Sequence, residues 1–259
     1  MSGPTTGRPA PGEAPDSRHA PWRRSPRQVP APPAGFVGRH RELAALDDAL
    51  SSPPDGQRPR LVVVTGPLGV GRTSLVRRWV ADRGHRFPDG QLYVDLASLR
   101  SGGPGTPVSD ALGECLLVLG VGLDYIPASL SGRVGLFRSV TAGTAVLVVL
   151  DEATEPAQAG YFMPGSRTSA LLVTSQDHLT ELTLDGARHL AVDPMDHDEG
   201  VALLRALCGP GRLEQEPQAV DRLVQLGQGL PLDLRIIAAR LAKDPGLSAS
   251  ELADSLPLP

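Results

Sequence analysis

An apolar strand that runs into a glycine-rich turn and then a helix most constrains what this chain can fold into. Residues 61–64 (LVVV) form a short β-branched run typical of a buried strand. Residues 66–73 (GPLGVGRT) follow it and open a helix predicted over residues 71–82. Glycines let successive backbone N–H groups point into one anion-binding concavity, and the helix N-terminus adds partial positive charge. The pattern therefore predicts a phosphate-binding loop of the Walker A type, although such a loop taken alone is also compatible with an ordinary glycine-rich turn.

One position of this loop departs from the motif. Arg72 stands where lysine is expected, and its planar guanidinium is bulkier than an ammonium beside a tightly wrapped phosphate. We expect nucleotide binding to survive in weakened form and γ-phosphate chemistry to suffer more. Because Lys243 is the only lysine in the chain, codon drift is the alternative origin of Arg72. Thr73 supplies the hydroxyl expected to meet Mg²⁺. The residues predicted to contact the nucleotide from this segment are Gly66, Pro67, Leu68, Gly69, Val70, Gly71, Arg72, Thr73 and Ser74.

A second apolar strand ends in two acids. Residues 146–150 (VLVVL) precede Asp151 and Glu152, which is the Walker B pattern. Asp151 would hold Mg²⁺ through its water shell, and Glu152 would orient or deprotonate the attacking water. Acids after a buried strand also occur as solvated strand ends. Their place after the glycine-rich loop, where a P-loop protein has its second acidic element, favours the catalytic interpretation.

The order of the predicted elements indicates the fold class. Strands separated by helices argue for a parallel sheet with right-handed crossovers, and here for a doubly wound α/β fold of the P-loop class. After Pro194 only helices are predicted. We therefore expect a nucleotide-binding domain over residues 35–195 and a small all-helical subdomain over residues 196–259, docked over the nucleotide. The predicted strands span 61–64, 91–96, 145–150, 171–174 and 189–192, and the predicted helices 39–50, 71–82, 108–119, 129–140, 196–207, 217–226, 232–241 and a short one after Ser248.

Composition excludes several classes of protein. The chain has 259 residues and a net charge of −4, so it is not expected to bind nucleic acid through a general basic surface. Cys115 and Cys208 are its two cysteines, which indicates neither a disulfide framework nor a zinc site and fits a reducing cytoplasm. No apolar run is long enough for a membrane span.

The first 34 residues have a different character from the rest. They are rich in proline, glycine and serine, so we predict a disordered tail. The tail is locally basic around Trp22, and a nucleic-acid or partner-binding arm is the alternative to a solvated tail. The basic residues there are Arg18, Arg23, Arg24 and Arg27.

With these elements in view, the sequence resembles the NB-ARC domains of the STAND class of signal-transduction ATPases, as found in multidomain transcriptional regulators of high-GC bacteria. The similarity runs from about residue 36 to the end of the chain. Besides the two Walker elements, it rests on short motifs in the family's order. These are residues 36–39 (FVGR), 92–96 (LYVDL), 172–176 (LVTSQ) and 229–232 (GLPL).

The resemblance implies roles for several residues. Val37 and Arg39 would help to hold the adenine, and Pro231 would pack on the nucleotide. Gln176 stands where the family usually places an arginine that reads the γ-phosphate, so a positive charge is missing there. The family's winged-helix subdomain, whose histidine clasps the ADP β-phosphate, would lie beyond Pro259. Glu152, by contrast, is a better catalytic acid than the asparagine that related regulators often carry.

We therefore expect a switch module that binds ADP or ATP with Mg²⁺, hydrolyses ATP weakly or not at all, and acts on a protein partner or effector domain in trans. Two alternatives are kept: a slow but active ATPase, supported by Thr73, Asp151 and Glu152, and a degenerate pseudo-ATPase that serves as an interaction scaffold, supported by Arg72 and Gln176. A small-molecule kinase is disfavoured because no acceptor-binding acid or lid is apparent.

Three other residues near these motifs have structural interpretations. Trp79 lies on the helix after the loop and is predicted to be part of the core. Arg133 and Arg138 precede the second acidic strand, and a solvated helix face is the favoured interpretation over a role as arginine fingers.

Overall fold

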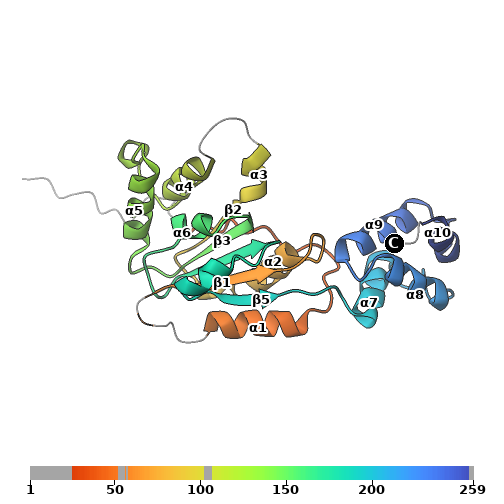
Figure 1. The fold of residues 1–259 in the computed structure, drawn as a ribbon. Coiled ribbons are helices and arrows are strands. Elements are labelled where there is room, and N and C mark those ends of the chain that lie inside the picture. Colours follow the sequence, from red (N-terminus) through yellow and green to blue (C-terminus); the bar gives the residue numbers. More distant parts are fainter. Residues whose placement is uncertain (1–24, 52–55, 57, 102–106, 257–259) are drawn as a thin grey trace, which may run out of the picture.

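The computed structural model describes residues 25–51, 56, 58–101 and 107–256, and they form two lobes joined side by side (Figure 1). The first lobe holds a five-stranded sheet in the order β2-β3-β4-β1-β5, and all four strand pairs are parallel. This confirms the predicted α/β architecture. The strands are β1 (Arg60–Thr65), β2 (Gly90–Asp95), β3 (Val146–Ala153), β4 (Ala170–Ser175) and β5 (Arg188–Ala191).

Helices cover both faces of this sheet, which explains why the three inner strands β1, β3 and β4 carry continuous buried runs, whereas the edge strand β5 is mostly exposed. Side chains of β1 alternate between the two faces, so Leu61 and Val63 belong to one core and Val62 and Val64 to the other. Trp79 is 2% exposed in the second core, as predicted. The helices of this lobe are α1 (His40–Ser51), α2 (Arg72–Arg83), α3 (Leu96–Ser101), α4 (Pro107–Val118), α5 (Leu130–Thr141) and α6 (Pro156–Tyr161).

The second lobe is helical and has its own buried core. Three of its helices begin at residues with a recognisable helix-start pattern. Asp196 and Ser248 form capping boxes with the acids three residues later, and α9 starts with Pro231 in its first turn. The helices are α7 (His197–Cys208), α8 (Pro217–Leu226), α9 (Pro231–Lys243) and α10 (Ala249–Ser255).

The segment before α1 differs from the sequence expectation. Residues 25–34 were assigned to a disordered tail, yet Arg27 forms a parallel bridge with Gln91 at the edge of β2. The backbone N–H of Gln28 donates to the Gln91 carbonyl at 2.9 Å, and the N–H of Gln91 donates to the Pro26 carbonyl at 2.7 Å. Prolines are tolerated at a sheet edge, so their density did not exclude pairing here. The rest of the tail, with Trp22, lies outside the described residues.

The two helices α3 and α6 were not predicted, because six residues carry too little periodicity to recognise. Arg133 and Arg138 have structural partners. Arg133 donates to the carbonyls of Ser109 and Pro127 at 2.6 and 2.8 Å, and Arg138 donates to the carbonyl of Gly160 at 3.1 Å. Both arginines therefore tie α5 to its neighbours.

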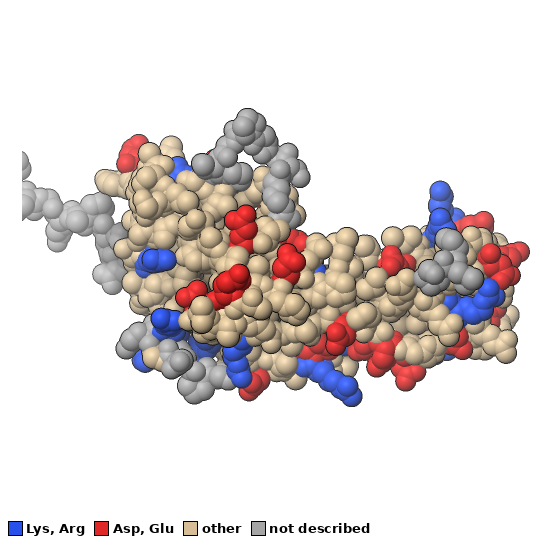
Figure 2. Space-filling view, viewed as in Figure 1, with Lys and Arg blue, Asp and Glu red and all other residues tan. Residues whose placement is uncertain are grey.

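Charges are mixed over the surface. On the face shown in Figure 2, acidic and basic side chains alternate over both lobes, and no single basic surface forms there. No helix in the described part of the chain has the length and apolar character that a membrane span requires.

Candidate nucleotide site

The glycine-rich loop lies at the carboxyl end of β1 and leads into α2. Gly71 precedes the helix with φ 98°, a left-handed conformation that favours glycine, and the helix begins at Arg72. The loop borders a cavity of about 250 Å³ between the two lobes. Six of the predicted loop residues therefore line one space that also receives Glu152 and Pro231. The lining residues are Leu68, Gly69, Gly71, Arg72, Thr73, Ser74, Glu152, Pro231, Leu232 and Arg235.

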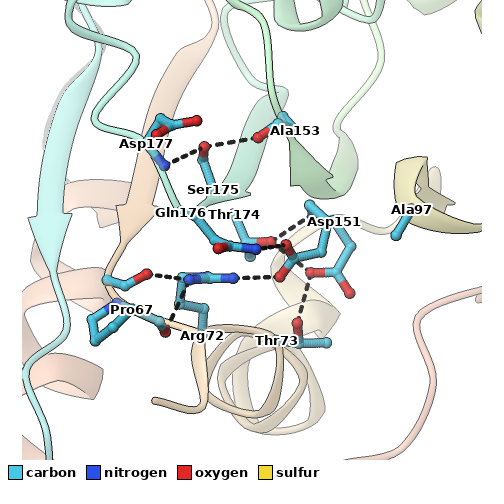
Figure 3. A network of polar contacts seen from close by, with 12 residues as sticks. Pro67, Arg72, Thr73, Ala97, Asp151, Ala153, Thr174, Ser175, Gln176 and Asp177 are labelled. Carbon is cyan, nitrogen blue, oxygen red and sulfur yellow. Dashed lines mark hydrogen bonds and ion pairs between the residues drawn. The ribbon is translucent and has the colours of Figure 1, made fainter. Parts of the chain in front are cut away.

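Arg72 is turned back onto its own loop. Its side chain is 3% exposed, and its guanidinium donates to the carbonyls of Gly66 and Pro67 (Figure 3). Nη2 also forms an ion pair of 2.5 Å with Oε1 of Glu152. The cation that would meet the phosphates is thus already bound to protein acceptors in this structure.

Asp151 accepts hydrogen bonds from three hydroxyl groups and is 5% exposed. Its Oδ1 accepts from Thr73 at 2.8 Å and from Thr174 at 2.6 Å (Figure 3), and its Oδ2 accepts from Tyr93 at 2.5 Å. Burial and the hydrogen bond to Asp151 raise the pKa of Tyr93 to about 12, so the phenol keeps its proton at neutral pH. The predicted pair of Thr73 and Asp151 is brought together, and two further donors were not foreseen.

Glu152 sits at an irregularity in β3. The register with β4 shifts between Leu150 and Ala153, and Glu152 has φ 59°. Such a bulge re-aims a side chain, here toward Arg72. The Glu152 N–H donates to Thr174 Oγ1 at 2.9 Å, and the amide of Gln176 donates to the other carboxylate oxygen of Glu152 at 3.4 Å. A neutral amide therefore lies where the resemblance places an arginine.

The donor set fits Mg²⁺ carried by a nucleotide. Thr73 and Asp151 offer oxygen ligands 2.8 Å apart, and Mg²⁺ in proteins combines one or two such ligands with waters and substrate phosphates. Two oxygen ligands of this kind suit a metal that arrives with phosphates. Among the described residues, no group of three or more His, Cys, Asp or Glu is close enough to hold a metal ion.

A second, apolar pocket adjoins the loop. Arg39 is 4% exposed there and lies in the left-handed region with φ 62°. Its guanidinium donates to the carbonyls of Asp193 and Val70 at 2.7 and 3.1 Å and pairs with Glu42 at 2.6 Å. Both terminal nitrogens of this guanidinium are therefore bound to acceptors within the protein. Its backbone N–H donates to Glu199 of α7 at 2.9 Å. The pocket is lined by Phe36, Val37, Arg39, Val70, Gly71, Ser74, Met195, Leu203, Pro231 and Arg235.

The helical lobe touches the loop directly through the start of α9. The backbone N–H of Leu232 donates to the Gly69 carbonyl at 3.2 Å. Arg235, one turn later, lines both cavities and donates to the Ala34 carbonyl at 2.9 Å. Sequence reasoning missed Arg235, and the available signal was a cation four residues after Pro231 on the same helix face.

Comparison with known proteins agrees with this geometry. The AAA ATPase domain family matches residues 35–224. The regulatory protein AfsR of Streptomyces coelicolor is 38% identical over 238 residues, which cover 89% of this chain. The chain spans 23% of the length of that relative.

Solved structures share the fold. A Walker-type ATPase of Pyrococcus abyssi superposes with a TM-score of 0.57 at 15% identity, over 85% of this chain and 71% of that one. A STAND protein with a tetratricopeptide repeat sensor from Pyrococcus horikoshii gives a TM-score of 0.55 at 20% identity, over 81% and 30%. Since the family match over residues 35–224 spans the glycine-rich loop, the paired acids and the first part of the helical lobe, the chain belongs to the AAA ATPase domain family.

Proposed function

We propose that this chain is an adenine-nucleotide switch module of the NB-ARC/STAND type, with weak or no ATP hydrolysis. Membership of an ATPase domain family implies nucleotide binding. The observation that supports a switch is the hydrogen bond from the backbone N–H of Leu232, in the helical lobe, to the carbonyl of Gly69 in the glycine-rich loop. Because of this bond, a ligand that changes the shape of the loop would also shift the start of α9.

In this proposal the nucleotide occupies two adjoining cavities. The phosphates would lie against the loop, where Thr73 and Asp151 would hold Mg²⁺, and the bound Mg²⁺ would neutralise part of the phosphate charge. The base would enter at the apolar pocket that Val37 and Pro231 line, whose volume of about 20 Å³ in this structure must widen to admit a purine ring. Arg39 also lines this pocket, and its backbone N–H donates to Glu199 of the helical lobe.

Weak hydrolysis follows from where the charges lie. Phosphoryl transfer requires positive groups aimed at the charge that develops in the transition state. Arg72 is bound to Glu152, so the cation and the acid that would orient water neutralise each other. Gln176 contributes no charge beside them. Thr73, Asp151 and Glu152 are nevertheless together in one site, which supports the slow but active ATPase as the second candidate.

A switch needs contacts that differ between its nucleotide states. The phosphates of either nucleotide would compete with Glu152 for Arg72, whereas only a γ-phosphate would reach the outer part of the cavity and change the surroundings of Arg235. We place the boundary between the moving parts at residue 195, with the nucleotide-binding domain over residues 35–195 and an ARC-type subdomain after it. The module would act in the cytoplasm on a protein partner or effector domain, in line with the regulatory name of its Streptomyces relative.

Calorimetric titration of ADP and ATP, with and without Mg²⁺, into the protein and its Arg72→Lys variant tests the proposal. Binding at micromolar or lower Kd by the natural protein is the expected result. Arg138→Lys, the same change on α5, is the matched control and should bind like the natural protein. No binding by any variant refutes the switch and leaves the scaffold. Phosphate release that disappears in Glu152→Gln would favour the active ATPase.

A further inference from the structure

Two sets of hydrogen bonds connect α2 to Asp151. One is the direct bond from Thr73, and the other passes from Arg77 through Tyr93. Nη2 of Arg77 donates to the phenol oxygen of Tyr93 at 2.9 Å, and its guanidinium lies 5.5 Å from the centre of the Tyr93 ring. The Tyr93 hydroxyl in turn donates to Asp151 Oδ2 at 2.5 Å. Arg77 follows Thr73 by one helical turn, so both routes start from the same face of α2.

The two routes hold different oxygens of the carboxylate. Thr73 and Thr174 both donate to Oδ1, whereas the Tyr93 hydroxyl donates to Oδ2. A carboxylate held at one oxygen alone still rotates about its Cβ–Cγ bond, and a donor on the second oxygen stops that rotation. Hydrogen bonds to an ionised acceptor are about twice as strong as neutral ones. The nearby charge of Arg77 polarises the phenol and makes it a better donor.

We propose that Tyr93, supported by Arg77, is a positioning residue that orients Asp151 toward the Mg²⁺ of a bound Mg–nucleotide. The inference rests on the proposed nucleotide-binding function. Partners that orient metal ligands from outside the coordination shell typically contribute 10- to 100-fold to metal affinity. A core-filling role would need only the aromatic ring, because phenylalanine occupies the same volume without the hydroxyl.

Tyr93→Phe is the variant that separates these roles. Two quantities are measured for each protein: ADP affinity in EDTA by calorimetry, and Mn²⁺ affinity of the ADP-loaded protein by electron paramagnetic resonance, with Mn²⁺ in place of Mg²⁺. We expect ADP affinity in EDTA to change less than twofold and Mn²⁺ affinity to fall about 10-fold. Tyr125→Phe is the matched control, since Tyr125 is 79% exposed and is not one of the three hydroxyl donors to Asp151, and it should change neither quantity.

A second variant keeps the inference testable if Tyr93→Phe does not fold. Arg77→Gln retains the phenol but removes its charged partner, so it should give a smaller loss of Mn²⁺ affinity in the same direction. Unchanged Mn²⁺ affinity in both variants overturns the inference while nucleotide binding stands. An equal loss of ADP affinity in EDTA also overturns it, because the role of Tyr93 would then be structural. Absence of ADP binding by the natural protein removes the proposed function and the inference together.

Discussion

The ion pair between Arg72 and Glu152 links stability to nucleotide affinity, and Glu152→Gln tests that link. The pair is 2.5 Å long, with side chains 3% and 22% exposed, so water screens it little. A hydrogen bond to a charged partner contributes about 1.5–3 kcal/mol. Glutamine still accepts an ordinary hydrogen bond of about 1 kcal/mol, yet it removes the charge from the pair. We therefore expect the ligand-free variant to lose ~0.5–2 kcal/mol of unfolding free energy, a fall in Tm of about 1–8 °C.

The stability lost in the ligand-free variant should be regained as tighter nucleotide binding. Under the proposed function, a nucleotide phosphate displaces Glu152 from Arg72 in the natural protein, and this competition is weaker in the variant. ADP should therefore bind about 2- to 30-fold more tightly to Glu152→Gln. ADP is used because it lacks the γ-phosphate, whose repulsion by Glu152 would add a separate effect. Both quantities are measured in one buffer, by urea unfolding without ligand and by calorimetry with ADP.

Glu181→Gln makes the same chemical change at an exposed position and serves as the control. A less stable Glu152→Gln protein with unaltered ADP affinity would refute the reasoning, because Arg72 would then stay with position 152 when nucleotide binds. A variant with unchanged stability would refute it at the first step, since the pair would contribute nothing to the folded state.

Two further predictions concern the helical lobe. Gly229→Ala should destabilise the protein by more than the ~1–2 kcal/mol cost of a left-handed alanine, because the new Cβ would lie 2.3 Å from the Met195 carbonyl oxygen. Gly143→Ala meets no atom within 4 Å at φ 76° and is the control in thermal unfolding, so equal losses would contradict the clash. Backbone N–H groups at the start of α10 lower the pKa of Glu216 below 4.5, so its contribution to stability is present above pH 4.5 and lost as the pH falls through the lowered pKa. The urea midpoint of Glu216→Gln should lie below that of the natural protein at pH 7, and a gap that does not narrow as the pH falls from 5 to 2 would count against this.

Much of the fold was predictable because its determinants are local. The β-branched run at residues 61–64 and the glycines that follow specify a strand and a turn within a dozen residues. Asp196 and Ser248 start helices through bonds to residues three positions later. Such interactions depend on spacing along the chain, which a sequence displays directly. The meeting of Thr73 with Asp151 was also predictable, since Asp151 lies near the carboxyl end of β3 and Thr73 follows the loop at the carboxyl end of β1 in the same parallel sheet.

The remaining features depend on which distant segments become neighbours. β4 lies between β1 and β3, and this order brings Thr174 against Asp151 and leaves the edge of β2 open to residues 25–34. The periodicity of a strand specifies its buried faces but not its partner. The sequence therefore predicted neither the contact of Thr174 with Asp151 nor the pairing of residues 25–34 with β2.

The sequence alone determined that this protein has a glycine-rich loop between a buried strand and a helix, two adjacent acids near the end of a second strand, and a helical lobe in which two helices begin with capping boxes. Only the tertiary structure decided what these groups do to one another. It pairs Arg72 with Glu152 across 80 positions of the chain and brings Tyr93 to Asp151 across 58. Sequence shows which charges and hydroxyls are available. Their pairing follows from strand order, register and a backbone bulge at Glu152, which no local pattern encodes.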